Sequence, residues 1–533
     1  MTALATQSAA PQQAAEYTTY SAATRWIVLA AVMAGTVMEV LDISIVNVAV
    51  PDMMGNLGAT LDQISWVATG YIVANVIILP LTGWLSSHFG RRRYLAGSII
   101  MFTAASILCG LSRTLNELII FRIMQGMGGA ALLSTAQATL FEIFPPWQLG
   151  MVQAIFGIGV MVGPTVGPTL GGWITDSYSW RWCFFINVPI GILAAALTLM
   201  FMHDSKYKRA SNGKVDVIGI GLLAIGIGAL QTMLEKGHRE DWFQSNLICW
   251  LALFSAVGII AFVWWELRNP HPAVELHVLR FKDFTAGTLF GMILGFGLYG
   301  GIFVLPVYLQ QLRGFTAAQT GWIMFPGGMA TAITLPFTGK LVSKMAPRLM
   351  VTIGTSIFIL TMWMLHFITL STSAHQLFWP LALRGVAMGF LFMPLTMVAL
   401  GSLKGKDIGA GTGLFNLARQ LGGSAGIAFL STFVDHRSTV HRATLVDNIS
   451  VYNPIALQRL HNAQQWLMSK GMAAPVAKKG ALALIDRSVQ GQSMVMAYSD
   501  AFIIIGAAFV VAMPLVLLFK KGKLAMMQRG GGH

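Results

Sequence analysis

Long apolar runs dominate the chain, and short polar patches separate one run from the next. A helix needs about 20 apolar residues to cross the hydrocarbon core of a bilayer, and many of the runs have that length. The fold class is therefore predicted to be an all-α polytopic membrane protein. The pattern predicts fourteen membrane-spanning helices with these approximate bounds: Trp26–Val48, Gln63–Leu85, Tyr94–Leu111, Leu115–Phe141, Gly150–Ile174, Trp182–Phe201, Val215–Leu234, Asn246–Leu267, Phe284–Leu309, Ala317–Leu341, Leu349–Leu370, Leu377–Leu400, Ile408–Val434 and Asp500–Phe519.

The composition agrees with this prediction and excludes a soluble globular protein. Hydrophobic residues make up 55% of the 533-residue chain and charged residues only 11%, whereas a soluble domain has about 25% charged residues. The three cysteines, Cys109, Cys183 and Cys249, are odd in number and all fall in apolar runs. They predict buried thiols rather than a disulfide framework or a metal site.

The formal charge of +14 could indicate a nucleic-acid partner, but the distribution of the basic residues favours a membrane explanation. With the N-terminus inside, most Lys and Arg residues fall in inner loops and tails, for example Arg91, Arg92 and Arg93 between the second and third spans. This is the bias of the positive-inside rule. It predicts that both termini are cytoplasmic and that no nucleic acid binds.

A sequence repeat predicts two related halves. The stretch LPLTGWLSSHFGRR at Leu79–Arg92 recurs as LPFTGKLVSKMAPR at Leu335–Arg348, and Gln125-Gly126 is echoed by Arg384-Gly385. Both copies of the longer stretch end a span on the inner side, so they have the same orientation. Parallel repeats of this kind describe halves related by an axis along the membrane normal, with the substrate site between them, as in the major facilitator superfamily.

The repeat also predicts how the chain is divided, because it matches spans one to six with spans nine to fourteen. Spans seven and eight are then an insertion between the halves. The predicted parts are a cytoplasmic tail at 1–25, an N-terminal six-helix half at 26–202, a two-helix insertion at 203–267, a cytoplasmic linker at 268–283, a C-terminal six-helix half at 284–519 with a long polar periplasmic loop at 435–499, and a cytoplasmic tail at 520–533.

Two acids, Glu39 and Asp42, lie in the middle of the first apolar span, and three arginines lie inside later spans: Arg122, Arg384 and Arg419. Intramembrane charges are costly and mark a pathway, an ion pair or a proton relay. Arg122 and Asp42 lie at similar distances from the outer ends of their helices, so the rise per residue places them at similar depth. The alternative for each of the three arginines is a structural ion pair between helices.

The cost of placing Glu39 and Asp42 in an apolar span is explained if these acids carry protons. A carboxylate beside an arginine stays ionised, whereas a carboxylate in an apolar site holds a proton, so alternation between these settings would carry protons across the membrane. Glu39 precedes Asp42 by three residues and lies on the same side of the helix. The sequence leaves open which acid is the carrier, and whether one of them only pairs with Arg122 or Arg419.

The fifth predicted span carries a stripe of small residues. Four glycines recur every four residues with two prolines among them: Gly159, Gly163, Pro164, Gly167, Pro168 and Gly171. Such a stripe lets another backbone approach closely, and the prolines favour a kink. It is a packing motif that we interpret as a seam where the halves meet or rock.

Five stretches together resemble a known family. They are similar to the motifs of the fourteen-span drug:proton antiporters of the major facilitator superfamily, the EmrB/QacA group. The stretches are LDISIVNVAVP at Leu41–Pro51, GWLSSHFGRRRYL at Gly83–Leu95, RIMQGMGGA at Arg122–Ala130, the glycine-proline run at Gly159–Gly172 and WRWCFFINVPIG at Trp180–Gly191. The resemblance covers nearly the full length. It departs at Ser87, where many members carry Asp, which puts a charge-relay gating role for that loop in doubt.

The resemblance implies a proton-coupled multidrug efflux antiporter of the bacterial inner membrane. Such a protein exports amphipathic or lipophilic toxic compounds by alternating access and contributes to antibiotic resistance, with the proton gradient as energy source and no cofactor. Asp42 and Arg122 occupy the proton-coupling positions. The implied partners, besides drugs, protons and the bilayer, are a periplasmic membrane fusion protein (EmrA-like) and an outer-membrane channel (TolC-like). Asp435–Ser499 is either their docking surface or a passive loop.

Two other functions compete with this one. A narrow exporter of one metabolite, siderophore or fatty acid would have the same fold. A membrane-embedded enzyme is disfavoured because the sequence has no HExxH pattern, no Cys/His metal cluster and no Walker motif.

The substrate cavity is expected to be lined by Met and aromatic side chains, which adapt to varied ligands. Ordinary packing or contact with lipid is the favoured alternative for each candidate. The candidates are Met33, Phe156, Met161, Phe303 and Phe415.

Overall fold

The computed structural model describes residues 20–204, 215–342, 344–405, 407–450 and 452–519. Within these ranges the protein is helical and has no β-strand. Most of the predicted N-terminal tail, the predicted C-terminal tail and residues 205–214 of the predicted insertion lie outside the described residues.

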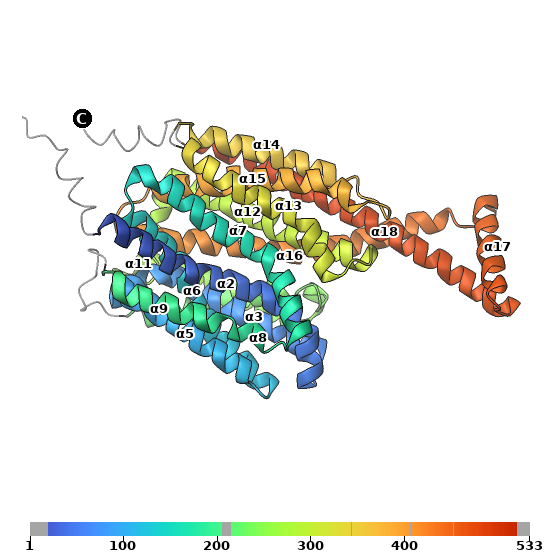
Figure 1. Ribbon diagram of the computed structural model, residues 1–533, viewed down its shortest axis with the longest axis horizontal. Helices are drawn as coiled ribbons and strands as arrows, with labels where there is room; N and C mark the ends of the chain where they lie inside the picture. The colour runs from blue at the N-terminus through green and yellow to red at the C-terminus, as the bar shows by residue number, and fades with distance from the viewer. Residues whose placement is uncertain (1–19, 205–214, 343, 406, 451, 520–533) are drawn as a thin grey trace, which may run out of the picture.

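The helices form one elongated bundle in which the early and the late helices lie on opposite sides (Figure 1). The first group is α2 (Ala22–Leu57), α3 (Leu61–Ile78), α4 (Thr82–Phe89), α5 (Arg91–Leu111), α6 (Leu115–Ile143), α7 (Pro146–Ser177), α8 (Trp182–Phe185) and α9 (Asn187–Phe201). The inserted pair is α10 (Val217–Lys236) and α11 (Asn246–Arg268). The second group is α12 (Lys282–Val307), α13 (Ala317–Leu341), α14 (Pro347–Leu365), α15 (Ala374–Gly401), α16 (Asp407–Asp447), α17 (Pro454–Ser469) and α18 (Ala474–Ala512).

Eleven of the described helices are long and apolar enough to cross a membrane, or twelve when the two arms of a bent α7 count as one span. Helices α13 and α16 also run within the bundle (Figure 1), but glycine and polar residues make them less apolar. The all-helical, multi-pass fold is therefore confirmed, while the number of fourteen spans stays a prediction.

Four helices start with the same capping device. Helices α3, α6, α13 and α15 begin after Thr60, Thr114, Thr316 and Ser373, and each has a reciprocal pair of bonds between the cap residue and a Gln or Glu three positions later. The pair satisfies two of the backbone N–H groups that a helix start leaves free. Since the repeat relates α3 to α13 and α6 to α15, the device occurs at equivalent places in both halves.

The shorter sequence echo also has one structural role in both halves. A Cβ atom at Gly126 would overlap the carbonyl oxygen of Tyr71 in α3, and a Cβ atom at Gly385 would overlap that of Gly327 in α13. Only glycine permits backbones to approach so closely. Helix α6 therefore crosses α3 in the same way as α15 crosses α13.

The inserted helix α10 is bonded to both halves. Lys236 Nζ lies 3.1 Å from Oδ1 of Asp62, just inside the start of α3. On the same helix, Gln231 donates a hydrogen bond of 2.7 Å to Ser424 of α16. The inserted pair thus connects the two groups of helices instead of standing apart from them.

The segment between the last two predicted spans is a helical arm rather than a loop. Helix α16 continues to Asp447 and α18 already begins at Ala474, while α17 packs across the end of the arm, beyond the bundle (Figure 1). Helix α16 is not interrupted after its apolar part because 435–447 contains neither glycine nor proline. Pro454 opens α17 at a first-turn position, where a missing N–H is harmless.

Candidate functional site

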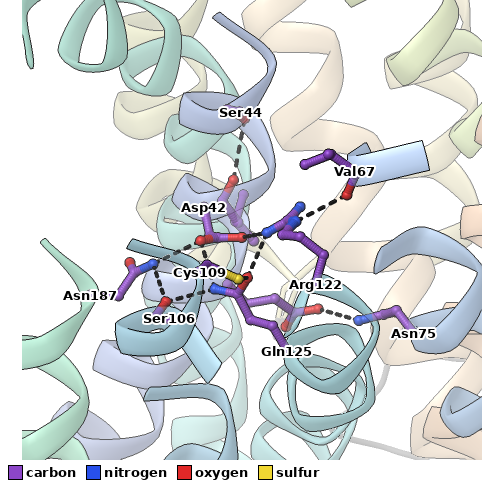
Figure 2. Close-up of polar contacts among 11 residues, drawn as sticks. Asp42, Ser44, Val67, Asn75, Ser106, Cys109, Arg122, Gln125 and Asn187 are labelled. Atoms are coloured by element: carbon purple, nitrogen blue, oxygen red, sulfur yellow. Dashed lines mark hydrogen bonds and ion pairs between the residues drawn. The ribbon is translucent and has the colours of Figure 1, made fainter. Parts of the chain in front are cut away.

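Asp42 of α2 is fully buried and accepts hydrogen bonds from three side chains (Figure 2). Arg122 Nη1 of α6 donates to Oδ2 at 2.6 Å. Gln125 Nε2 of α6 and Asn187 Nδ2 of α9 donate to Oδ1 at 2.9 and 2.8 Å. The expected proximity of Asp42 and Arg122 is therefore present, as a buried ion pair held by two further donors.

The surroundings of Arg122 complete this network. Its Nε donates to the carbonyl of Val67 at 3.1 Å and its Nη1 to Oε1 of Gln125 at 2.7 Å. The guanidinium lies 4.2 Å from the ring centroid of Tyr71. Ser106 Oγ in turn accepts from Gln125, at 2.7 Å. Breaking a buried pair of this kind leaves an uncompensated charge, so both partners must be preserved or neutralised together.

Three members of this network were not expected as site residues: Gln125, Ser106 and Asn187. Gln125 lies within RIMQGMGGA and Asn187 within WRWCFFINVPIG. Both motifs were recognised in the sequence, but a neutral amide within them did not indicate a partner of Asp42. Asn187 donates to Ser106 Oγ at 3.0 Å as well as to Asp42. Ser106 stands in an apolar run with no pattern around it, and only the packing of α5 brings it to the site.

Glu39 has a different environment, although it lies on the same helix as Asp42. It is 4% exposed and accepts one side-chain hydrogen bond, from Asn75 Nδ2 at 3.1 Å. Its other carboxylate oxygen has no partner among the described residues. Glu39 lies within electrostatic range of Arg419 in the other half. The structure thus separates the two acids into a fully bonded one and a sparsely bonded one.

The remaining intramembrane arginines are not ion-paired. Arg384 Nη1 donates to the carbonyl of Gly301 at 3.3 Å, and Arg419 lies 5.3 Å from the ring centroid of Phe392. Neither has a carboxylate within ion-pair distance in the part of the chain that the structure describes. A buried ion pair is therefore present at Arg122, whereas the described residues show none at Arg384 or Arg419.

The glycine stripe of α7 packs against α2, the helix that carries both acids. A Cβ atom at Gly159 would lie 2.6 Å from Met33, and one at Gly163 would lie 2.6 Å from Val40. Further along, Gly167 meets Ser44 and Gly171 meets Ile45 in the same way. These four glycines therefore face α2 within the first half. Other residues of α7 contact the second half, since a Cβ atom at Gly321 of α13 would overlap Oγ1 of Thr169. Helix α7 thus lies where the halves meet, and a rocking motion there stays a prediction.

Helix α7 bends within this stripe. Its arms Pro146–Met161 and Val166–Ser177 meet at 41°. Pro164 lies at the break and Pro168 in the second arm, and both remove a backbone donor from the helix interior. The bend was expected from the sequence, and it curves α7 around α2.

The halves also meet near Arg91, at the end of the bundle that the sequence predicts to be the inner one. A Cβ atom at Gly83 would lie 2.6 Å from the backbone nitrogen of Ala410 in α16, and one at Gly339 would lie 2.7 Å from the carbonyl oxygen of Gly150 in α7. Gly83 and Gly339 occupy the same position in the longer repeat. The repeat therefore marks two related contacts between the halves.

Polar contacts reinforce the inner end. Asn416 of α16 donates to Oε1 of Gln137 in α6 at 3.0 Å, which links the halves directly. Arg91 and Glu142 form an ion pair beside it within the first half. Ser87, which replaces the family's Asp, donates only to the carbonyl of Trp84, at 2.8 Å, among the bonds described for it.

The five candidates for lining the substrate cavity belong to the packed interior. Phe156 and Phe415 are fully buried and Met161 nearly so. Met33 and Phe303 are partly buried and pack on the same core. Their contact with substrate stays a prediction.

The cysteine expectation is confirmed for two of three residues. Cys109 and Cys183 are buried, whereas Cys249 is exposed on α11. An apolar run in a membrane helix can face lipid as well as protein, and α11 exposes large neighbours such as Trp250 and Phe254.

On the inner side, His277 lies 3.2 Å from Asp407 and 3.8 Å from Glu275, distances that suit ordinary ion pairs.

A serine-enzyme reading of one short stretch is not supported by its local structure. Residues 422–426 have the spacing G-x-S-x-G. A nucleophile elbow needs a sharp turn between a strand and a helix. Ser424 instead lies in the middle of α16 and accepts the hydrogen bond from Gln231.

Comparisons with known proteins agree with this fold. Residues 32–427 match the sequence profile of the Major Facilitator Superfamily. The multidrug export protein EmrB of Escherichia coli strain K12 is 34% identical over 508 residues, which cover 95% of this chain and 98% of that protein. The fatty acid resistance protein FarB of Neisseria gonorrhoeae is 33% identical over 515 residues, which cover 96% and 98%.

A solved structure gives the same fold at low identity. The crystal structure of the human organic anion transporter MFSD10 (TETRAN) matches with a TM-score of 0.61 at 12% identity, covering 92% of this chain and 99% of that one. This likeness shows the fold alone. The sequence matches identify the chain as a multi-pass membrane transporter. The chain belongs to the Major Facilitator Superfamily and, within it, to the EmrB-like transporters.

Proposed function

We propose that the protein is a proton-coupled multidrug efflux antiporter of the bacterial inner membrane. The observation that carries this proposal is the buried Asp42–Arg122 pair with its amide donors, because nothing in an apolar bundle requires such a pair for packing. The relatives support the export of drugs, since one is a multidrug export protein and another, at 27% identity, is a colistin resistance protein of Acinetobacter baumannii.

Proton coupling follows from the chemistry of the pair. A proton on Asp42 would neutralise the carboxylate and leave Arg122 without its counter-ion, so the network of α2, α6 and α9 would have to rearrange. A ligand or proton can drive transport only if it binds one state of the transporter better than the other. We infer that protonation favours separation at the inner end, where the Gly83–Ala410 and Gly150–Gly339 contacts must open.

Orientation and partners rest on weaker support and belong to the same proposal. The cluster of basic residues at the end near Arg91 supports an orientation in which that end and both termini are cytoplasmic. The arm formed by the outer parts of α16 and α18 with α17 then projects into the periplasm, where an EmrA-like adaptor and a TolC-like channel would engage it. The proton gradient is the energy source.

A second candidate is a narrower exporter of fatty acids. FarB supports it by its name and by 33% identity over 96% of this chain. Arg384 and Arg419, which have no acidic partner among the described residues, favour it on physical grounds.

The test is efflux from proteoliposomes under an imposed pH gradient, with ethidium and dansyl-labelled undecanoic acid as parallel substrates. Wild type is expected to export at least one of them only when the gradient is present, and Asp42→Asn is expected to remove the response. Asp52→Asn is the matched control, because Asp52 is exposed near the outer end of the same helix. Gradient-independent export by wild type would contradict the proposal.

A further inference from the structure

Arg419 is a buried cation with no carboxylate within ion-pair distance among the described residues. It is 3% exposed, and its Nη1 has no hydrogen-bond partner among the described residues. Its one described ring contact is with Phe392, at 5.3 Å from the centroid. An uncompensated guanidinium inside a membrane protein is costly, so its retention indicates that an anion occupies this place during the working cycle.

Arg384 is a second intramembrane cation of the same half, and it contacts α12. It is partly buried, and its only described hydrogen bond is to the carbonyl of Gly301, at 3.3 Å. Arg419 contacts the same helix, because a Cβ atom at Gly295 would overlap its carbonyl oxygen. Gly295 and Gly301 are six residues apart on α12, which corresponds to about 9 Å along the helix axis. The backbone of Arg419 and the side chain of Arg384 therefore contact α12 at two different levels.

The acids of the first half do not neutralise these charges. Asp42 is saturated by Arg122, Gln125 and Asn187. Glu39 is within electrostatic range of Arg419, but no oxygen of it lies within ion-pair distance of that guanidinium. An anionic ligand that binds Arg419 would therefore not have to displace a protein carboxylate already paired with this guanidinium.

The surroundings of Arg419 select the kind of anion. Phe392 and Phe415 are each 1% exposed, and Phe415 lies one helical turn before Arg419 on α16. Tyr299 is within electrostatic range of the guanidinium. A guanidinium binds the two oxygens of a carboxylate in a planar fork. Aromatic rings beside it favour an apolar chain over a hydrated inorganic ion.

We propose that Arg419, assisted by Arg384, forms an anion subsite that binds the carboxylate of an amphipathic organic acid between the halves. The proposal rests on the proposed function in one respect, that substrate binds between the two halves. It deepens that function by naming the substrate class and its recognition residue. Arg419 is the direct ligand, and Arg384 raises the affinity through its charge.

The test measures equilibrium binding to purified protein in lipid nanodiscs, with no gradient. The probes are dansyl-labelled undecanoic acid, its methyl ester and the amine with the same tail, each corrected for binding to empty nanodiscs. Wild type is expected to bind the acid about tenfold or more tighter than the ester, as for a hydrogen bond to a charged group. The amine should bind more weakly than the acid.

The variants separate recognition from folding. Arg419→Gln should bring the Kd of the acid to that of the ester while the Kd of the ester stays unchanged, and Arg419→Lys should retain part of the preference. Arg384→Gln should reduce the preference by a smaller factor. Arg313→Gln is the matched control, since Arg313 lies beyond the end of α12 and donates to the carbonyl of Leu370, in the loop after α14. It should leave the preference intact.

Two results would overturn the subsite. One is equal binding of acid and ester by wild type, and the other is a parallel loss of both in Arg419→Gln, which would make Arg419 a packing residue. Because the assay uses no gradient, a failure of gradient-driven efflux would contradict proton coupling and leave the subsite standing. If wild type binds the acid no better than the ester but still exports substrate under a gradient, the subsite is wrong and proton coupling is unaffected.

Discussion

The two halves place different chemistry at equivalent positions. In the first half Gln125 precedes the glycine that lets α6 cross α3, and it donates to Asp42. In the second half Arg384 precedes the glycine that lets α15 cross α13, and it has no acid among its described contacts. The scaffold is thus duplicated down to the close approach of the backbones. Equivalent positions therefore carry different chemistry. Gln125 binds an acid, whereas Arg384 is a cation with no acid among its described contacts.

The same contrast separates the two acids of α2. Asp42 accepts three side-chain hydrogen bonds, all from the first half, whereas Glu39 accepts one and lies opposite Arg419. A saturated carboxylate changes its charge only when its donors move, which couples protonation to the positions of α6 and α9. A sparsely bonded carboxylate lacks that coupling. Asp42 is therefore the stronger candidate for the proton carrier.

The largest expected effect is the loss of coupling in Asp42→Asn. The amide cannot take up a proton, so gradient-driven efflux should fall to less than about a hundredth of the wild-type rate, while ligand binding persists. Proteoliposome efflux and a binding titration on the same preparation check both parts. Transport at the wild-type rate would make Asp42 structural and shift the search to Glu39.

The next effect tests the duplicated contact at the inner end. Gly83→Val places a side chain where a Cβ atom would already lie 2.6 Å from the backbone of Ala410. Overpacking of this kind should change the ratio of closed to open inner ends by about tenfold or more. Spin-label distances between the inner ends of α4 and α16 measure the shift.

Two companions sharpen this result. Gly339→Val, at the equivalent place in the second half, should give the same direction of change. Gly97→Val should give none, because no heavy atom lies within 4 Å of a Cβ at that exposed helical position. An equal shift in all three variants would contradict the assignment of the seam.

A smaller effect is expected where the inserted helix joins the halves. The double variant Lys236→Met/Gln231→Leu removes the contacts with Asp62 and Ser424, together with the contact of Lys236 with the ring of Trp66 at 4.4 Å. Loss of one to two polar contacts should lower the Tm by about 2–4 °C. A thermal-shift assay measures it, with the exposed Lys478→Met as control.

The smallest effect tests the scaffold alone. Thr114→Ala and Ser373→Ala each remove the hydroxyl of a capping box, at the starts of α6 and α15. Each should destabilise the protein by about 1 kcal/mol. Similar shifts in the two variants, measured by chemical denaturation, would support an equivalent duplicated scaffold, and a shift confined to one half would count against it.

The sequence alone was sufficient to predict features that depend on neighbouring residues or on position along a single helix. Apolar runs predicted the helices, and counting residues from the helix ends placed Asp42 and Arg122 at one depth. It was not sufficient where the answer depends on which face of a helix meets which neighbour. The glycine stripe of α7 faces α2, and Asn187 reaches Asp42 across 145 residues of chain. Neither fact has a local signature.

Two further differences have physical causes. The segment after Val434 is polar, which suggested a loop, but helix formation outside the membrane needs only uninterrupted good helix formers and a place to pack. For Arg384 and Arg419 the sequence left open a pathway, a relay or an ion pair with an acid on another helix. No acid lies within ion-pair distance of either arginine among the described residues, and sequence position alone could not show this.

The most direct measurement is of the protons released when substrate binds. Purified protein in weakly buffered detergent solution would be mixed with saturating ethidium or dansyl-labelled undecanoic acid while a pH dye records the change. The account predicts proton release on binding by wild type and by Asp52→Asn, and none by Asp42→Asn at equal occupancy. Undiminished release by Asp42→Asn would contradict the claim that Asp42 couples protons to transport.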